Sequence, residues 1–575
     1  MQPTQQRRVR IAFILLIAAL TVFSVFVLPF FFPPSIPSVS TAYAAGASNR
    51  VAEIAAGLLS LLVAFVTFRF ALPSPTSAAH RNQHGQPISR RWLWAALAGM
   101  SFFMLVIGAA MVRANSFYGE AAYFLTQIDK GLKLHLVLYR TVQFAYGPLL
   151  YWWPVLWIKA LQPFGVRTIP AYVGSLLTTQ AAGIVLLFYT VRALPLRRGM
   201  QVFAFAALVI GSLTPAMGSN HSIFRFVVPM AMAVWLSRRN GLAAAAATAA
   251  LGALAGFAVS SEIGIGCIGA TLGCSIARAH TSGKRWLILI PAALAAAGLF
   301  FLLAGPAYLQ TIRNAASGAY DILLTPEPRT LLLLIATVAL APIAVARALR
   351  RKDPYAPMLA AIYGSALGLM PVAIARCDSV HEFFFSLGAI LLSLVAIDED
   401  TLRRPARLWI ACIALWVVMA QLANYHLYQR ELASLARQAL HPQPDTFDTA
   451  ALERQLNGQR VFLIDGVSWP ANQELLDKGL LMPSFFADFS SIWRKPAEQR
   501  MIAEMRAAKY ALAYPEIAVP VDFDAGPVAR WKRLGLVYRE KYQPFEPGLL
   551  TEQELNRNWT PIATLSGEVL YRKLR

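Results

Sequence analysis

Long apolar runs separated by short polar loops recur along the first three quarters of the chain. Most of them are long enough to cross the roughly 30 Å of hydrocarbon in a bilayer, and the shorter ones approach that length. Because backbone polar groups in lipid must be satisfied within their own segment, we expect each run to form a helix. The predicted spans are residues 11–32, 51–70, 92–112, 171–191, 200–217, 223–237, 241–258, 263–277, 286–304, 330–346, 355–373, 383–397 and 408–423.

The pattern changes after residue 423, where the apolar runs stop. The segments "GQRVFLIDGVSW", "AAKYALAYPE" and "GEVLYRKLR" are typical of short strands, and "AEQRMIAEMRAAK" is typical of an amphipathic helix. The sequence therefore predicts a polytopic α-helical membrane protein with about eleven core spans plus an N-terminal hairpin, and a small C-terminal α/β domain. We expect domains at residues 1–91, 92–423 and 424–575.

Composition and charge agree with a membrane protein and indicate its orientation. The chain is 57% hydrophobic and only 14% charged, and its formal net charge is +22. Such a charge is also found in nucleic-acid-binding proteins, but fifteen Lys and Arg residues lie on alternate short loops and only four on the short loops between them. This asymmetry places the basic loops in the cytoplasm. We therefore expect no nucleic-acid partner and an extracytoplasmic C-terminal domain.

The same asymmetry predicts that the apolar run 144–163 does not cross the membrane. If it crossed, every later basic loop would face outward. Its Tyr and Trp content is typical of the membrane interface, so we expect one or two juxtamembrane helices within a long outer loop, residues 113–170. That loop carries basic residues of its own, for which an anionic substrate would be a reason.

The N-terminal sequence is typical of a membrane anchor or a secretory signal. Three arginines precede the run 11–32, and the segment "STAYAAG" after it places Ala42 and Ala44 as at a signal-peptidase site. The run is longer than a usual signal core, so we favour a retained anchor with its N-terminus inside. The four cysteines show no metal-ligand spacing, and no metal site is predicted from them.

Candidate chemistry lies in the outer loops, because ionisable residues at membrane depth are costly and often functional. Glu120 directly follows a span and opens an amphipathic run, so it could act as a general base or hold a divalent cation; the alternative is a solvated loop charge. Arg376, Asp378 and His381 form a tight cluster that could grip a phosphate, or a salt-bridged loop between two helices. The remaining candidates are Arg140, Tyr146, His221, Arg225 and Glu262.

The candidate residues are suited to a substrate that reaches them from the membrane. The chain contains no Walker loop, GxGxxG, HExxH or serine-hydrolase elbow. Soluble nucleotide chemistry is therefore not expected, and the substrate should be reachable from the membrane and the outer face.

Three motifs in order, "YGEAAYFLTQIDKG", "YGPLLYWW" and "LQPFG", give the chain a resemblance to the GT-C superfamily of membrane glycosyltransferases. In that family a first span leads into a long extracytoplasmic loop that opens with an acidic motif, and the donors are polyprenyl-phosphate sugars. The resemblance covers about Trp92 to the C-terminus. It departs from the family at Gly119, where many members have Asp, so only Glu120 carries over.

The resemblance implies inverting sugar transfer at the extracytoplasmic face of a bacterial inner membrane. Glu120 would deprotonate an acceptor hydroxyl of a glycan, lipid or protein, and Arg376 with His381, and Arg225 or Arg140 as further candidates, would hold the leaving lipid phosphate. Tyr146, His221, Glu262 and Asp378 would line the substrate site. No cofactor is certain, and the departure at Gly119 leaves the use of a divalent cation open.

Two other classes of function compete with this interpretation. A transporter or lipid flippase would show internal repeats and broken helices near the midplane, whereas here the polar residues gather at one face. A polymerase or ligase of surface polysaccharide would favour a large loop late in the bundle, whereas here the large loop is early.

Overall fold

The computed structural model describes most of the chain, in stretches separated by short gaps. The described residues are 3–70, 87–117, 120–212, 221–398, 403–442, 447–464, 469–486, 491–518, 526–535 and 540–574.

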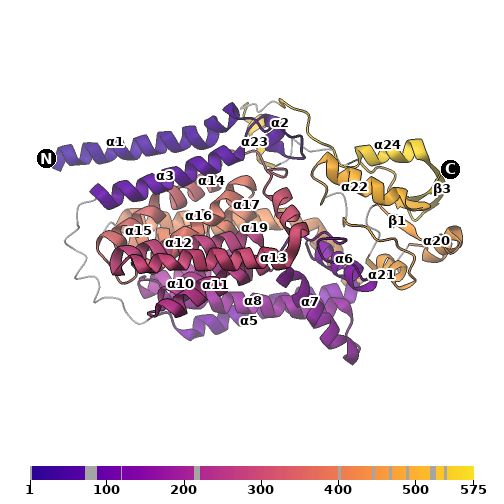
Figure 1. The fold of residues 1–575 in the computed structure, drawn as a ribbon, viewed down its shortest axis with the longest axis horizontal. Coiled ribbons are helices and arrows are strands. Elements are labelled where there is room, and N and C mark those ends of the chain that lie inside the picture. The colour runs from indigo at the N-terminus through magenta and orange to yellow at the C-terminus, as the bar shows by residue number, and fades with distance from the viewer. Residues whose placement is uncertain are drawn as a thin grey trace.

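Most of the described chain forms a bundle of long apolar helices (Figure 1). Within the described residues, nine helical segments are long and apolar enough to cross a membrane. They are Ala12–Phe31 (the end of α1, Pro3–Val22, with η1, Phe23–Val27, and η2, Leu28–Phe31), α3 (Asn49–Phe70), α5 (Arg90–Ala114), α8 (Thr168–Ala193), α11 (Leu242–Val259), Lys284–Asn314 (η5, Lys284–Ile288, with α13, Leu289–Ala315), Pro328–Arg350 (α14, Pro328–Leu334, η6, Ile335–Leu340 and α15, Ala341–Arg350), α16 (Ala356–Ala375) and Ala406–Ala423 within α19 (Arg403–Leu440).

The other predicted spans are also helices, but shorter, bent or less apolar. The helices α9 (Arg198–Ser212) and α10 (Ser222–Ser237) are short apolar helices, and α17 (Ser379–Phe385) meets α18 (Leu387–Asp398) at an angle of 61°. The helix α12 (Ser261–Ser282) completes the set. Each predicted apolar run thus coincides with a helix, apart from residues 213–217, which lie outside the described residues. The prediction of a polytopic helical membrane protein is confirmed.

Close packing of α12 on α16 depends on small residues. Gly269 and Gly273 lie one turn apart on α12, and a Cβ at either would overlap backbone carbonyls of α16, at Gly364 and Ala360. Glycines at this spacing let two helices approach closely in a membrane, where van der Waals packing rather than the hydrophobic effect drives association. This contact fixes the centre of the bundle.

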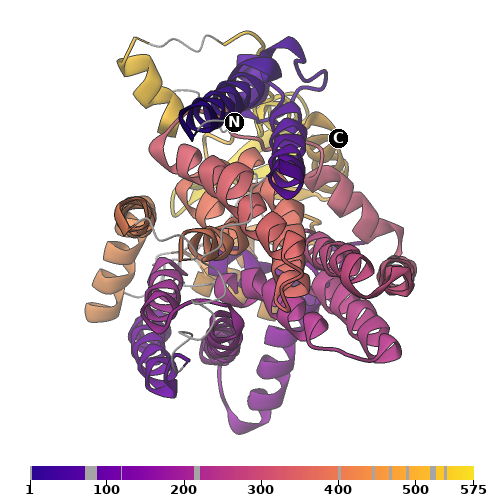
Figure 2. The ribbon, with the colours of Figure 1, turned by 90° about the vertical axis from the view of Figure 1, so that its left-hand side faces the viewer.

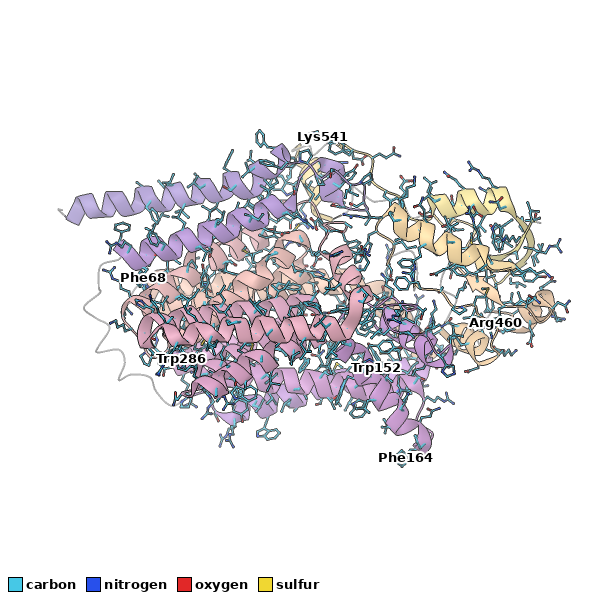
Figure 3. The ribbon with its side chains drawn as sticks, in the orientation of Figure 1. Phe68, Trp152, Phe164, Trp286, Arg460 and Lys541 are labelled. Atoms are coloured by element: carbon cyan, nitrogen blue, oxygen red, sulfur yellow. The ribbon has the colours of Figure 1, made fainter. Side chains whose placement is uncertain are left out.

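The two ends of the bundle differ in chemistry. One end, which we call the basic end, carries the loops after α8, α10, α12 and α15 with their clustered Lys and Arg residues. The other, which we call the domain end, carries α6, α7 and the C-terminal domain (Figure 1). Figure 3 shows Phe68 and Trp286 near the basic end and Trp152 and Arg460 at the domain end. Viewed along the helices, α1 and α3 lie at one edge of the bundle (Figure 2).

The helices α6 (Glu120–Lys133) and α7 (Pro148–Leu161) are short. Each has 14 residues, which at about 1.5 Å per residue gives roughly 21 Å, short of the hydrocarbon thickness. The helix α6 lies between the bundle and the C-terminal domain, and α7 lies beside α8 at the same end of the bundle (Figure 1). The prediction that the run 144–163 does not cross is consistent with this geometry.

The C-terminal domain contains a small sheet covered by short helices. Its strands are β1 (Val461–Leu463), β2 (Tyr510–Ala513), β3 (Trp559–Leu565) and β4 (Glu568–Lys573), in the order β1-β2-β4-β3. The pair β1–β2 is parallel, with Phe462 opposite Ala511, and the other pairs are antiparallel. The helices are α20 (Thr449–Leu456), α21 (Trp469–Asp477), α22 (Lys495–Arg506), α23 (Gly526–Arg533) and α24 (Leu549–Asn558). The predicted α/β domain is confirmed, with β3 as an additional strand.

The segment between η2 and α3 joins the bundle to the C-terminal domain. It contains α2 (Thr41–Ala45), in which Ala42 and Ala44 are buried. The carbonyl of Ala44 accepts hydrogen bonds from the backbone N–H groups of Lys541 (2.7 Å) and Tyr542 (3.0 Å). Two segments far apart in the sequence, around Ala44 and around Lys541, therefore pack together at the domain end.

Candidate active site

Glu120 begins α6 at the domain end of the bundle. A carboxylate in the first turn of a helix is stabilised by the partial positive charge of the helix N-terminus. The hydroxyl of Tyr146, from the turn before α7, donates a hydrogen bond to Glu120 Oε2 (3.1 Å). Burial, and next the charge of Glu120, raise the pKa of Tyr146 well above its usual value, so the phenol stays a donor. Glu120 Oε1 has no hydrogen bond to any described residue, and it is the oxygen available to accept a proton.

A buried ion pair lies behind Tyr146. Arg225, in the first turn of α10, pairs with Glu262, in the first turn of α12, at 2.5 Å between Nη2 and Oε1. The Arg225 guanidinium also stacks on the Tyr146 ring, 4.3 Å from its centroid. Tyr146 is therefore held between Glu120 and Arg225, and the charge of Arg225 is balanced by Glu262. Because a buried charge is stable only when paired, removal of either partner would be costly.

His221 precedes α10 in a strained backbone conformation, with φ +60°. Its side chain is fully buried, and Nδ1 lies 2.8 Å from Thr179 Oγ1. Burial, and next the charge of Arg225, lower the pKa of His221 to about 3, so the imidazole is neutral at physiological pH. Its Nε2 has no hydrogen-bond partner among the described residues. Strain and an unpaired buried nitrogen in one residue are typical of functional sites. The neighbouring Asn220 lies outside the described residues.

Phe124 connects His221 to the other residues of this group. The Phe124 ring centroid lies 5.2 Å from that of Tyr146 and 5.7 Å from that of His221. The structure thus brings together five of the predicted residues, which we call the Glu120 group: Glu120, Tyr146, His221, Arg225 and Glu262.

The predicted cluster after α16 also forms. Asp378 caps the N-terminus of α17 by accepting from the backbone N–H groups of Val380 (3.0 Å) and His381 (2.9 Å), and its Oδ2 lies 2.7 Å from His381 Nδ1. Burial raises the pKa of Asp378, but the charge of His381 and its hydrogen bonds outweigh burial and lower that pKa to about 2. Arg376 stacks on the Tyr320 ring at 4.1 Å. Asp378 thus orients His381, and the charge of Arg376 also lowers the pKa of Asp378.

Arg140 belongs to neither group. It is exposed in the loop between α6 and α7, where its carbonyl accepts from Arg500 of the C-terminal domain (2.9 Å). Asp129, the second carboxylate of the opening outer loop, is buried and accepts from Gln473 of α21 (2.5 Å). Lys133 pairs with Asp477 of α21 at 2.7 Å. These contacts dock α6 on the C-terminal domain.

Tyr428 is a residue of this region that sequence reasoning missed. It lies on α19, beyond the segment that spans the membrane. Burial raises the pKa of Tyr428, the charges of Glu120, Glu431 and Asp378 raise it further, and Arg376 lowers it. Since charges act strongly only over short distances, Tyr428 is a common neighbour of the Glu120 group and the cluster after α16. The resemblance also predicts that Glu120, Arg376 and His381 line one outward-facing cavity, and this stays a prediction.

The described residues do not include three His, Cys, Asp or Glu side chains arranged to hold a metal ion. In the Glu120 group both carboxylates already have partners, Tyr146 and Arg225. This donor set does not fit a divalent cation held by protein ligands alone.

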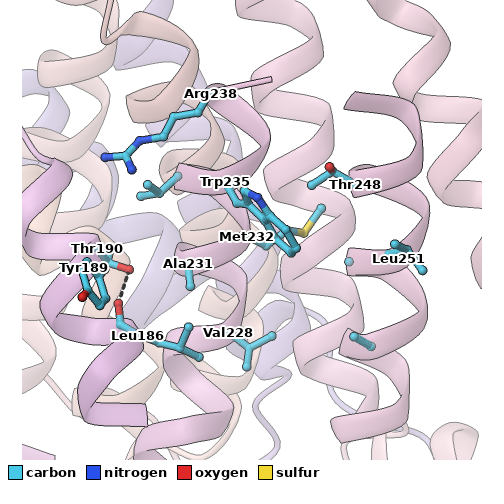
Figure 4. Close-up of a pocket in the computed structure, with 13 residues that line it drawn as sticks. Leu186, Tyr189, Thr190, Val228, Ala231, Met232, Trp235, Arg238, Thr248 and Leu251 are labelled. Carbon is cyan, nitrogen blue, oxygen red and sulfur yellow. Dashed lines mark hydrogen bonds between the residues drawn. The ribbon is translucent and has the colours of Figure 1, made fainter. Parts of the chain in front are cut away.

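An apolar cavity of about 430 Å³ lies away from these residues, between α8, α10 and α11 (Figure 4). Tyr189, Trp235 and Leu251 line it and are half exposed, and Arg238 lies at its edge, at the basic end of α10. The cavity contains none of the predicted site residues, and we assign the chemistry to the polar groups at the domain end.

Fold and site define a class: a polytopic helical membrane protein with polar clusters at one end of the bundle, covered by a small α/β domain. No protein-family model matches the chain. No curated protein matches it in sequence.

Several solved structures are similar to the chain, and two of them are membrane proteins bound to a polyprenyl phosphate. One is the archaeal oligosaccharyltransferase AglB from Archaeoglobus fulgidus, in complex with an inhibitory peptide and a dolichol-phosphate, with 12% identity, 73% of this chain and 69% of that chain covered, and a TM-score of 0.42. The other is ArnT from Cupriavidus metallidurans bound to undecaprenyl phosphate, with 10% identity, 84% of this chain and 98% of that chain covered, and a TM-score of 0.45. Both likenesses are weak.

Proposed function

We propose that the protein is an integral membrane glycosyltransferase that moves a sugar from a polyprenyl-phosphate donor to an acceptor hydroxyl at the domain end. The observation that carries the proposal is Glu120: a carboxylate just outside a span, oriented through Oε2 by Tyr146, with Oε1 available. A carboxylate held in this way by a neutral donor suits general-base catalysis.

The proposed reaction is a single displacement with inversion. An acceptor hydroxyl attacks the anomeric carbon of the sugar while Glu120 Oε1 takes the hydroxyl proton. The bond between the anomeric carbon and the phosphate oxygen breaks, and the electron pair leaves with the lipid phosphate. The phosphate gains negative charge in this step, so nearby cations stabilise the transition state.

Arg376 and His381 are the residues we assign to that phosphate. Arg376 is a stacked guanidinium without an ion pair among the described residues, and His381 is oriented by Asp378. Arg225 is already paired with Glu262, which favours a role in holding Tyr146 over a role as a phosphate contact. His221 is neutral, and its Nε2, which has no partner among the described residues, suits a hydrogen bond to a substrate hydroxyl.

The proposal includes a location for the reaction. The loops at the basic end are rich in Lys and Arg, which favours the cytoplasm, so the domain end is extracytoplasmic and the membrane is a bacterial inner membrane. The acceptor is a glycan, lipid or protein that reaches this face.

The test is release of polyprenyl phosphate from a panel of polyprenyl-phosphate hexoses and pentoses by the purified protein in liposomes, with membrane extract as the source of acceptor. The Glu120→Gln variant keeps the shape of the side chain and its contact with Tyr146 but cannot take a proton. We expect its rate to fall by about 10²–10⁴-fold.

The matched control is Glu516→Gln, which changes an exposed carboxylate of the C-terminal domain that has no contact with the site. This variant should retain full activity. Equal turnover by the wild-type protein and Glu120→Gln would remove Glu120 as the base, and no release from any donor of the panel by the wild-type protein would overturn the function.

A further inference from the structure

Three arginines from distant parts of the chain converge on one short loop at the domain end. The loop, Ala316–Asp321, is the first part of the segment that connects α13 to α14. Arg50 donates a hydrogen bond to the carbonyl of Ala316, and Arg494 Nη2 donates to that of Ser317 (2.9 Å). Arg376 stacks on Tyr320 at 4.1 Å. We call Arg50, Arg376 and Arg494 the arginine cluster.

Each member of the cluster comes from a different part of the fold. Arg50 lies in the first turn of α3, in the N-terminal hairpin, and Arg376 ends α16 in the bundle. Arg494 precedes α22 in the C-terminal domain. Hairpin, bundle and domain therefore each supply one guanidinium to the same place.

The loop that the cluster surrounds is held firmly. Ser40 Oγ donates to the Asp321 carbonyl (2.7 Å), and Asn49 Nδ2 donates to the Ile322 carbonyl (2.7 Å). Tyr320 also packs against Trp493, with ring centroids 5.5 Å apart. The arginines thus lie on a preorganised platform, which lowers the entropy cost of binding a ligand.

The positive charge of the cluster is incompletely balanced. Two carboxylates lie nearby, Asp321 and Glu53, against three guanidinium groups. None of the three arginines has an ion pair within 4 Å in the described part of the chain, and the Nε atoms of Arg376 and Arg494 are buried without a hydrogen-bond partner there. Burial, and next the charge of Arg50, lower the pKa of Arg494, so like charges are close together. An anion with several acceptor oxygens would satisfy all of these groups.

We infer that the arginine cluster is a binding site for a phosphomonoester, assembled from the N-terminal hairpin, the bundle and the C-terminal domain. Asp321 competes with the ligand for the arginines. The inference extends the proposed function, which assigns a phosphate to Arg376, by adding Arg50 and Arg494 and by making the C-terminal domain part of the site. The phosphomonoester is either the lipid phosphate left after sugar transfer or a phosphorylated, water-soluble acceptor group.

Binding of two probes to the full-length protein in detergent micelles tests the inference and distinguishes these sources. Farnesyl phosphate represents a lipid phosphate, and glycerol 3-phosphate represents a water-soluble phosphomonoester; isothermal titration measures both. Binding of farnesyl phosphate alone assigns the site to a lipid phosphate. Binding of both probes, or of glycerol 3-phosphate alone, shows that the site recognises the phosphomonoester group without a lipid chain. Binding of neither probe overturns the inference.

Variants separate a ligand site from a structural contact. Arg494→Gln and Arg50→Gln should each weaken binding roughly ten- to hundredfold, as expected for loss of a hydrogen bond to a charged group. Arg460→Gln, at an exposed arginine of the same domain, should leave binding unchanged. Equal weakening in Arg460→Gln would show that the attraction is non-specific and would overturn the inference.

Asp321→Asn gives the sharpest distinction. If the arginines bind a phosphomonoester, loss of the competing carboxylate should tighten binding severalfold. If the arginines serve only to hold Asp321, the same variant should unfold at a lower temperature and bind no more tightly, which would overturn the inference.

Failure of this inference and failure of the proposed function can be told apart. Glu120→Gln should bind the phosphate probe as the wild-type protein does, because Glu120 is not in the cluster. Sugar transfer without probe binding would refute only the inference that the arginine cluster binds a phosphomonoester. Probe binding without sugar transfer would refute only the proposed glycosyltransferase function.

Discussion

At the scale of single residues, the polar side chains at the domain end satisfy each other's hydrogen bonds and charges. Tyr146 donates to Glu120 with its hydroxyl and presents its ring to Arg225, which is in turn neutralised by Glu262. Each of these groups would be costly to bury alone. Together they hold Oε2 of Glu120 in place, while its Oε1 has no hydrogen bond to any described residue.

Burial raises the pKa of Asp129 to about 6, and Lys133 and Gln473 partly offset this effect. A carboxyl whose pKa is raised by folding favours the folded state while it is protonated. Its contribution is therefore complete below pH about 4 and is lost as the pH rises through about 6. At roughly 1.4 kcal/mol per pKa unit, ionised Asp129 costs the fold up to about 3 kcal/mol at neutral pH.

We expect Asp129→Asn to raise the temperature of thermal unfolding at pH 7.5, because Asn is uncharged and still accepts from Gln473. The gain over the wild-type protein should shrink at pH 4.5, where Asp129 is protonated. Differential scanning fluorimetry at both pH values checks this, with Glu516→Gln as an exposed-carboxylate control. A gain of the same size at both pH values would contradict the assignment.

At the scale of elements, the short helices α6 and α7 position the site. The turn between them reaches the end of α11, where the N–H of Gly147 donates to the Val259 carbonyl (2.9 Å). The N–H of Ala145 donates to the hydroxyl of Tyr123 on α6 (2.8 Å). These bonds fix Tyr146 from both sides, so the geometry around Glu120 depends on one tight turn.

Gly147→Ala tests that dependence. A Cβ at this position would lie 2.6 Å from the Phe257 carbonyl oxygen and would also overlap that of Ala258. We expect the turn to move away from α11 and carry Tyr146 with it, which lowers sugar transfer by at least tenfold and stability by about 1–3 kcal/mol. Activity and thermal unfolding measure the two effects.

The control for this change is Gly99→Ala. Gly99 lies in α5, where an added Cβ meets nothing within 4 Å, and Ala is the better helix former. This variant should keep full activity and lose no stability. If Gly147→Ala behaved in the same way, the turn would not be what positions Tyr146.

The success of sequence reasoning differed between elements for physical reasons. Helices in lipid are dictated by long apolar runs, so the bundle could be predicted. The strand β3 escaped prediction because Pro561 interrupts it at the sheet edge, and only the Ser566–Gly567 turn, with φ of +52° and +91°, marks the hairpin.

The site could be predicted in part. Residues that follow a span directly, such as Glu120 and Arg376, are visible in the sequence because an ionisable side chain stands next to an apolar run. Tyr428, Arg50 and Arg494 were missed because their importance comes from contacts between remote segments. Tyr428 in particular lies on α19, which continues to Leu440, well past its apolar part.

At the scale of the whole molecule, polarity separates the two ends of the bundle. The basic end carries loops rich in Lys and Arg, and the domain end carries the Glu120 group, the arginine cluster and the C-terminal domain (Figure 1). The proposed chemistry requires that the domain end be extracytoplasmic.

Accessibility of introduced cysteines tests this orientation. Of the native cysteines, Cys267, Cys274 and Cys377 are buried and Cys412 is partly buried, so background labelling should be low. Arg460→Cys at the domain end should react with a membrane-impermeant maleimide in intact spheroplasts. Lys284→Cys at the basic end should react only after lysis. The reverse pattern would place the site in the cytoplasm and contradict the proposed location.

The backbone pairing of Ala44 with Lys541 and Tyr542 has a consequence for biosynthesis. A ribosome adds roughly 5–20 residues per second, so about 500 residues of synthesis separate these partners by roughly half a minute to two minutes. During that interval the segment after the first span is already across or at the membrane without its final neighbour. The domain end can therefore mature only after translation has nearly finished, and a chaperone or the membrane itself must shelter this segment until then.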